Sequence, residues 1–435
     1  MAWSLDPSSP RRDHTIKCTT PSNRSLYSSP VRTYLTILRI PAVRSALVLG
    51  LIVRIPMWAA SIILTLHVVG HLGRSYGQAG IVIAAATIAV AISGPWRGRL
   101  LDQRGLRRST WPNLIVLTLC WLIAPWVGYW PLIGFVFIAG LFVVPTFSIL
   151  RQVQVANVPD ELRKASLVLD AVLVEISFMI GPVLGVLMAH WWQTPIALLV
   201  AELTSVLGCA LLWIVNPPLG QSAETRAERH PVRSWLNLRV LAIMAAAGSA
   251  VLVLTGTDLY IVAALRALDM SGSIGWMLAI WGAGSAVGGL IYGAQKRHPP
   301  LMLLLGLLGA TTAAVTIAQD RLWLAVLLFV CGAFCAPTMT AAIDALMREV
   351  PLAVRGEAMG WHSSWITAAS AIGAPLIGFA LDLGGWHLGF ITAGTIGVAI
   401  AAVGWLLAPG TGASHEVDPT LPSADEVEAR ALGQG

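Results

Sequence analysis

The chain has 435 residues, of which 56% are hydrophobic and only 11% are charged, and its mean hydropathy is +0.74. This composition excludes a soluble protein of two or three domains, because too few polar residues remain to cover a surface in water. A net charge of +6 would suit a nucleic-acid partner in a soluble domain. In a membrane protein the positions of the basic residues report topology instead, so no nucleic-acid partner is expected.

Apolar runs close to the ~20 residues that cross a bilayer recur along the chain and predict an all-α membrane protein. We expect a disordered cytoplasmic arm over 1–44, a six-helix bundle over 45–215, a cytoplasmic linker over 216–238, a second six-helix bundle over 239–408 and a disordered cytoplasmic tail over 409–435. The twelve predicted transmembrane helices are 45–68, 78–97, 111–129, 131–151, 165–189, 194–215, 239–264, 273–295, 300–318, 321–347, 357–382 and 386–408.

Basic residues alternate between the two sides of these spans. They gather in the N-terminal arm and in the loops after even-numbered spans, whereas the opposite loops hold only Arg74, Arg266 and Arg321. The positive-inside rule therefore predicts that both termini are cytoplasmic, as an even number of spans requires.

The two halves of the chain repeat one another. The segment 140-GLFVVPT-146 matches 332-GAFCAPT-338, and 181-GPVLG-185 matches 374-APLIG-378. Earlier in each half, Gly77, Gly80, Gly94 and Gly98 correspond to Gly272, Gly275, Gly289 and Gly293. A duplicated bundle with a pseudo-twofold axis along the membrane normal suits alternating access, in which two halves rock about a central site. This repeat favours transport over catalysis.

The loop between spans two and three concentrates charge in a pattern, G-x-L-x-D-x-x-G-x-R-R, carried by Gly98, Leu100, Asp102, Gly105, Arg107 and Arg108. It resembles the signature loop of the major facilitator superfamily, although Gln103 and Leu106 stand where basic residues are common in that family. The resemblance covers the whole chain and implies a conformational latch. In it, Asp102 would meet the start of span eleven near Gly356 and a span-four arginine, for which Arg151 is the nearest candidate. The alternative is that the loop arginines only fix topology.

A second pattern lies in span five, where Gly181, Pro182 and Gly185 resemble the core of the facilitator motif associated with exporters. Val168, Ser177 and Val186 replace the other glycines of that motif. A proline and small residues kink a helix and let a neighbour approach closely, so we expect a kink here and only modest support for export.

Ionisable residues inside spans are costly and are therefore candidates for function. Arg54 in span one and Glu175 in span five lie at similar expected depths, and we predict that they pair, in a structural or a proton-coupling role. Asp170 lies roughly 140° around the helix from Glu175 and is expected to face the cavity mouth. Asp258, in the polar run 255-TGTD-258 of span seven, is a cavity candidate from the second half.

Together these patterns predict a facilitator of a prokaryotic cytoplasmic membrane that moves a small molecule by alternating access, with proton-coupled efflux of an amphipathic drug or metabolite as the first hypothesis. Import or uniport of a small organic solute and a non-transporting sensor or scaffold are the alternatives. We expect no enzyme activity, metal or cofactor, and no ATP, since no Walker-type loop occurs. A monomer is expected from the family resemblance.

Overall fold

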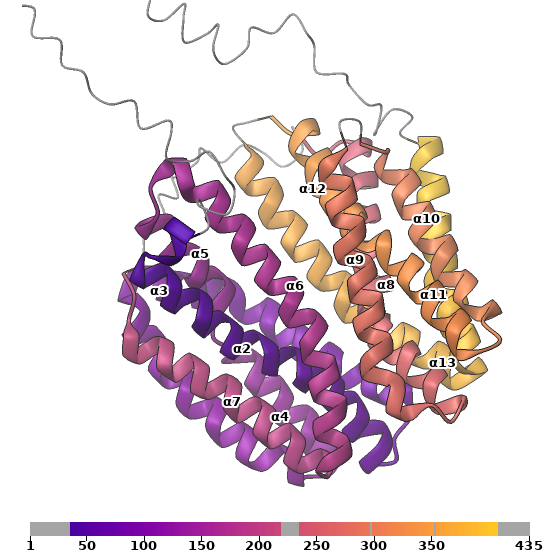
Figure 1. The fold of residues 1–435 in the computed structure, drawn as a ribbon, viewed down its shortest axis with the longest axis horizontal. Helices are drawn as coiled ribbons and strands as arrows, with labels where there is room; N and C mark the ends of the chain where they lie inside the picture. The colour runs from indigo at the N-terminus through magenta and orange to yellow at the C-terminus, as the bar shows by residue number, and fades with distance from the viewer. Residues whose placement is uncertain (1–34, 219–234, 296–297, 352–353, 408–435) are drawn as a thin grey trace, which may run out of the picture.

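The computed structural model describes residues 35–218, 235–295, 298–351 and 354–407. These residues form helices joined by short turns (Figure 1). The sequence predicts that the arm and the tail are disordered. The arm before residue 35, the tail after residue 407 and most of the expected linker lie outside the described residues. The helices are α2 (Pro41–Leu66), η2 (His67–His71), α3 (Tyr76–Ile123), η3 (Ala124–Trp126), α4 (Tyr129–Leu141), α5 (Thr146–Asn157), α6 (Asp160–Trp191), α7 (Thr194–Val215), α8 (Leu238–Ala267), η5 (Ser271–Ser273), α9 (Ile274–Ala294), α10 (Leu301–Ala314), η6 (Val315–Ile317), α11 (Arg321–Ala333), α12 (Cys335–Glu349) and α13 (Arg355–Leu407).

Among the described residues, nine helices are long and apolar enough to cross a membrane. Two of the helices contain a break: α3 at Gly105 and α13 at Gly384 and Gly385. Counting the two parts of α13 separately, and adding the second part of α3 and the shorter α10, gives the twelve crossings that the sequence predicts. The all-α membrane fold is therefore confirmed.

Several helices begin before the apolar runs do. α2 begins at Pro41 and α6 at Asp160, four and five residues before the predicted starts of those spans. A hydropathy pattern detects only the part of a helix that lipid covers, whereas the backbone hydrogen bonds continue into the polar first turn.

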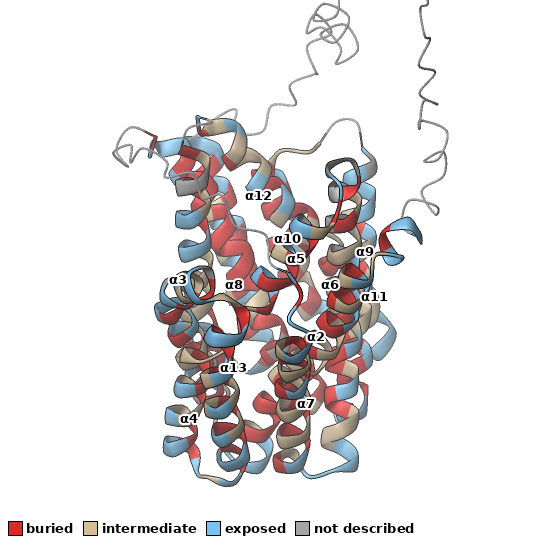
Figure 2. Ribbon diagram, turned by 90° about the vertical axis from the view of Figure 1, so that its left-hand side faces the viewer, coloured by how far each residue is buried: buried red, intermediate tan, exposed pale blue. Residues whose placement is uncertain are grey.

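The chain ends of the bundle define its two faces. We call the face reached by Pro41, Val215 and Leu407 the terminal face. The face that carries the turns after η2 and α8 is the opposite face. Around the sides between them, exposed residues cover the surface (Figure 2), and many are large and apolar, including Trp130, Leu290 and Ile372. Such a surface fits a lipid environment and not water.

The internal repeat appears as a matched pair of helix breaks. The fourth crossing stops at Leu141 and restarts as α5 at Thr146, and the tenth stops at Ala333 and restarts as α12 at Cys335. Both breaks fall inside the repeated segments 140-GLFVVPT-146 and 332-GAFCAPT-338. Interrupted helices at corresponding positions of two halves are typical of transporter binding regions.

The two halves meet closely on the opposite face. Gly80 of α3 packs on the backbone of Ala374 and Pro375 of α13, and Gly378 packs on that of Tyr76 and Gly77. The pseudo-symmetric interface is built alike: a Cβ at Gly275 of α9 would lie 2.8 Å from the Cα of Val183 in α6. Glycines permit this backbone contact because no side chain intervenes.

The same helices are separated at the terminal face. Cβ atoms built at Gly94 and Gly98 of α3, or at Gly360 of α13, would have no atom of the described residues of a neighbouring segment within 4 Å. One pair of helices therefore touches at one end and not at the other, so the structure is closed at the opposite face and not at the terminal face.

Candidate functional site

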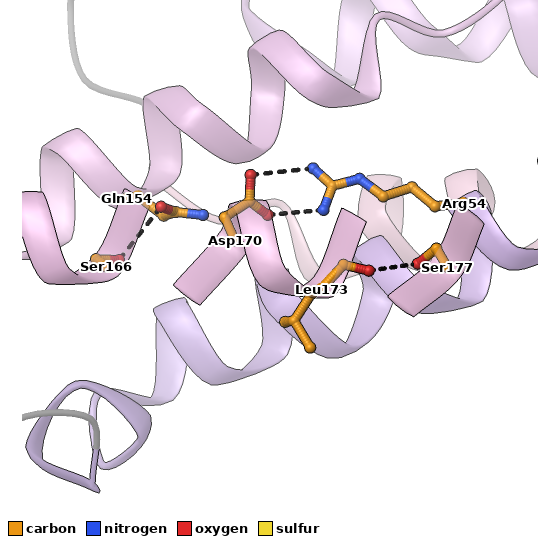
Figure 3. Close-up of polar contacts among 6 residues, drawn as sticks. All are labelled: Arg54, Gln154, Ser166, Asp170, Leu173 and Ser177. Atoms are coloured by element: carbon orange, nitrogen blue, oxygen red, sulfur yellow. Dashed lines mark hydrogen bonds and ion pairs between the residues drawn. The ribbon is translucent and has the colours of Figure 1, made fainter. Parts of the chain in front are cut away.

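The most buried charge of the described residues is Arg54, in the middle of α2. Its guanidinium forms a two-pronged ion pair with Asp170 of α6, with Nη1 to Oδ1 at 2.7 Å and Nη2 to Oδ2 at 3.2 Å (Figure 3). The Arg54 side chain is fully buried, whereas 17% of the Asp170 side chain is exposed. Fork-to-fork geometry fixes both orientation and charge, so this pair joins α2 to α6 rigidly.

The surroundings of Arg54 come from three helices. The guanidinium carbon lies 4.7 Å from the centre of the Phe147 ring in α5, close enough for a cation–π contact. Gly50, one turn earlier in α2, lets α5 approach, because a Cβ there would lie 2.8 Å from Cδ1 of Leu150. Ser166 donates to Gln154 at 3.2 Å, which ties α6 to α5 nearby (Figure 3). The pair is thus built within the first half of the molecule.

The predicted pairing of Arg54 with Glu175 is wrong, because the guanidinium pairs with Asp170. The position of Asp170 at the cavity mouth stays a prediction. Similar Cα depths along two helices do not place the ends of two long side chains at the same level, because an arginine side chain is long and tilted. Helical side chains point back toward the helix N-terminus, so the guanidinium reaches the level of Asp170 and not of Glu175. The expected angle of roughly 140° between the two acids explains why only one of them faces α2.

Glu175 is half-buried, and it lies near enough to Cys335 of the second half, the first residue of α12, for the two groups to interact electrostatically. One turn further along α6, the ring of Phe178 makes edge-on contact with that of Trp58 in α2, with the ring centres 4.8 Å apart. It also makes a tilted contact with the ring of Trp281 in α9, with the ring centres 5.6 Å apart. Glu175 therefore lies beside an aromatic bridge between the two halves.

The signature loop is only partly described. Gly105 has a φ of +71°, which only glycine adopts readily, and makes the turn between the second and third crossings. Arg107 donates to the carbonyls of Trp213 (3.4 Å) and Ile214 (3.0 Å) at the end of α7, so it caps a helix of its own half. Arg108 and Arg151 are exposed, and the side chain of Asp102 lies outside the described residues. The latch role of this loop remains a prediction.

Arg97, directly before that loop, is a buried cation that follows the apolar span Tyr76–Gly94. Its side chain is 4% exposed, and Nε and Nη1 have no hydrogen-bond partner among the described residues. Burial lowers the pKa of Arg97 to about 10, because the charged form loses its hydration. The segment before Asp102 thus carries a desolvated positive charge.

The glycines of the fifth crossing lie against α2. A Cβ at Gly181 would lie 2.9 Å from the carbonyl oxygen of Ile55, and one at Gly185 would lie 2.7 Å from that of Ala59. Pro182 stands between them inside α6. The pattern serves close packing of α6 on α2, which brings Asp170 to Arg54.

Asp258 lies in α8, and its side chain is outside the described residues. Its neighbours in the polar run are described: the Thr255 hydroxyl lies 3.0 Å from that of Ser370 in α13, and the Thr257 hydroxyl lies 2.9 Å from that of Tyr260. The role of Asp258 remains a prediction.

Sequence reasoning missed one acid altogether. Asp382 of α13 accepts a hydrogen bond from the backbone N–H of Tyr76 at 2.9 Å and another from that of Gly77 at 2.8 Å. Tyr76 and Gly77 begin α3, so a carboxylate of the second half caps a helix of the first half on the opposite face. The internal repeat contains a signal for this residue. Asp382 lies one turn after 374-APLIG-378, and the corresponding residue of the first half, one turn after 181-GPVLG-185, is Ala189.

Among the described residues, no group of three or more His, Cys, Asp or Glu side chains could hold a metal ion.

The family is decided by a comparison with protein-family models. The model described as Major Facilitator Superfamily matches residues 46–294 and 259–428. The chain belongs to this superfamily. A comparison with curated protein sequences finds no match.

Solved structures share the facilitator fold at low sequence identity. A bacterial homolog of the human lysosomal transporter Spinster aligns with a TM-score of 0.68 at 11% identity, over 87% of this chain and 97% of that one. A mutant form of the nucleoside transporter NupG aligns with a TM-score of 0.69 at 12% identity, over 84% of this chain and 100% of that one. A D-xylose–proton symporter aligns with a TM-score of 0.68 at 13% identity, over 88% of this chain and 99% of that one. At these identities the likeness supports the fold and not a substrate.

Proposed function

We propose that this facilitator is a secondary active transporter that moves a small amphipathic molecule out of a prokaryotic cell by alternating access, in exchange for protons. The terminal face is then cytoplasmic, because the basic loops of the sequence lie on that side. No ATP or metal takes part, and a single chain is the working unit.

The observation that carries this proposal is the asymmetry of the helix pair α3 and α13. The two helices are in backbone contact at Gly80 and Gly378 on the opposite face, whereas at the terminal face no described residue of a neighbouring segment contacts Gly94 or Gly360. In an alternating-access cycle this is the state that is open to the cytoplasm. Rocking the two halves about the centre would open the opposite face and close the terminal face.

The central residues support an amphipathic cargo and a proton. Trp58, Phe178 and Trp281 bring aromatic rings from both halves together, and aromatic rings bind apolar and cationic groups. Glu175 beside them has no arginine partner among the residues that the structure describes, since Arg54 pairs with Asp170. A carboxyl group in that position can gain and lose a proton as the halves move, which would couple transport to a proton gradient.

The test uses purified protein in liposomes loaded with a pH-sensitive dye, and adds lipophilic cations, organic acids, sugars and amino acids in turn. We expect proton movement with a lipophilic cation in the wild-type protein and its loss in Glu175→Gln. Asp320→Asn, which alters an acid that caps α11 on the opposite face, is the matched control and should transport normally.

The direction of proton movement separates the candidates. Proton entry against cation exit supports exchange, and proton entry together with a solute would replace efflux by import. Silence across the panel, from protein that binds one of these compounds in a thermal-shift measurement, would favour a sensor or scaffold and would end the transport proposal.

A further inference from the structure

We propose that a cavity on the opposite face, between α6 and α9, binds an oxyanion, a carboxylate or a phosphate. The cavity has a volume of about 380 Å³. α6 contributes Ala189 and His190 to its wall, η2 contributes His71, and the second half contributes Arg266, Ser271 and Gly272. The site lies on the other side of the central region from the terminal face, so it is separate from the site described above.

The chemistry of the wall favours a negative charge. Arg266, His71 and His190 carry or can gain a positive charge, and the side chains of Gln193, Thr194 and Ser271 can donate hydrogen bonds. No acidic side chain is among the described residues that line the cavity. Guanidinium groups match the planar, paired oxygens of carboxylates and the oxygens of phosphates, so an oxyanion is the ligand that these groups recognise best.

Arg266 is already held in place at the cavity. It extends from the end of α8 across to the first half, where a Cβ at Gly70 would lie 2.6 Å from its Nη2. Its guanidinium also forms a hydrogen bond with the Tyr76 side chain at the start of α3. Asp382 uses both carboxylate oxygens on the backbone of α3, so it satisfies the helix, and the remaining N–H groups of the guanidinium can meet a ligand.

The other half of the molecule contains the template for this site. In the repeat, Gly77 corresponds to Gly272 and Gly378 corresponds to Gly185, so Asp382 corresponds to Ala189. At the α3–α13 interface the Asp382 carboxylate occupies the space between the helices. At the α6–α9 interface the corresponding residue, Ala189, has only a methyl group. The space between the helices therefore stays open as the cavity, which basic side chains surround. An external oxyanion would supply the charge that the first half of the sequence lacks.

A ligand at this place would act on the conformation of the protein. Its contacts come from α6 and η2 in one half and from α8 and η5 in the other, and these elements meet only while the opposite face is closed. Binding would therefore stabilise the state seen here, because a ligand shifts a population toward the state that it binds better. This inference needs no transport activity and is tested without it.

The experiment measures thermal unfolding of the full-length protein in uncharged detergent. Sodium acetate or sodium phosphate is titrated against sodium chloride at constant ionic strength. For the wild type we expect a saturable increase in Tm of about 3 °C. Arg266→Gln should weaken the apparent affinity at least about tenfold, because it removes the guanidinium. Arg321→Gln, on the same face but outside the cavity, is the matched control and should respond as the wild type does.

Ala189→Asp is the second variant and tests the internal template. Its carboxylate should occupy the cavity, raise Tm without added anion and abolish the response to acetate and phosphate. Nanodiscs of phosphatidylcholine, with and without phosphatidylglycerol, separate the two sources of the anion. A Tm increase with phosphatidylglycerol that depends on Arg266 identifies a lipid headgroup, whereas a response to free anions alone identifies a soluble ligand. An equal response of the wild type and Arg266→Gln to every anion would overturn the inference.

Discussion

Asp382 and Gly77 come from opposite halves of the molecule, and the carboxylate of the first accepts the backbone N–H of the second at 2.8 Å. The contact is possible because Gly77 has no side chain: a Cβ there would lie 2.7 Å from the same carboxylate oxygen. Together with the bond from Tyr76, it places a negative charge on the positive end of α3. The interaction exists only while the opposite face is closed, so it stabilises this state relative to the state in which the opposite face is open.

The first prediction concerns Asp382→Asn. A carboxylate at a helix N-terminus contributes about 1 kcal/mol, so its loss should change the ratio of the two states by about fivefold. The readout is the alkylation rate of Gly360→Cys at the terminal face, in a Cys18→Ser background in which the four described cysteines are buried. We expect slower alkylation. Asp320→Asn is the control, because Asp320 caps α11 within one half, and an equal slowing there would contradict the role of Asp382 in holding the opposite face closed.

The second prediction concerns the Arg54–Asp170 pair. Asp170→Asn leaves a fully buried guanidinium without its counter-charge, which should cost about 3–5 kcal/mol of unfolding free energy and greatly lower the yield of monodisperse protein. The double variant Arg54→Leu with Asp170→Leu should recover most of this loss, because it removes both charges together. Size-exclusion profiles and thermal unfolding measure both effects.

Glu175→Gln separates this assignment from the pairing that the sequence predicts. Because Asp170 and not Glu175 holds Arg54, Glu175→Gln should fold as well as the wild type. If it were as damaging as Asp170→Asn, the ion pair of the structure would not be the one that stabilises α2 against α6.

Much of the architecture could be predicted because lipid imposes simple rules. The twelve crossings, the two halves and the break at Gly105 follow from apolar length, from repeated glycines and prolines and from the signature loop. The breaks at Phe142 and Phe334 were visible as the best-matched segments of the repeat, although their meaning as interrupted helices was not.

The partners of charged side chains could not be predicted in the same way. The depth of a Cα atom does not give the position of a guanidinium several bonds away, and so the wrong acid was assigned to Arg54. The repeat marks Asp382 as a difference between the two halves, but its partner is a backbone N–H group more than 300 residues earlier, which the side-chain pattern does not identify.

The third prediction uses two glycines of one helix. A Cβ at Gly80 would meet the backbone of Ala374 and Pro375, which cannot move aside as a flexible side chain can, so Gly80→Val should separate α3 from α13 on the opposite face. Transport should fall, and a cysteine replacing Ser75 at the start of α3 should become faster to alkylate. Gly94→Val, on the same helix with no neighbouring segment in contact, is the control and should leave the opposite face closed. The interface assignment fails if the two variants behave alike.

The last prediction asks whether Arg107 belongs to a latch or to a cap. Arg107 donates to two carbonyls at the end of α7, its guanidinium lies 5.8 Å from the Trp213 ring, and the indole N–H of Trp213 donates back to the Arg107 carbonyl at 3.1 Å. Arg107→Gln should therefore lower the unfolding free energy by about 1 kcal/mol, while the alkylation of Gly360→Cys stays unchanged, because all these contacts lie within one half. Arg108→Gln, an exposed neighbour, should change neither quantity. A change in alkylation with Arg107→Gln would instead make Arg107 a part of the conformational latch that the family resemblance implies for this loop.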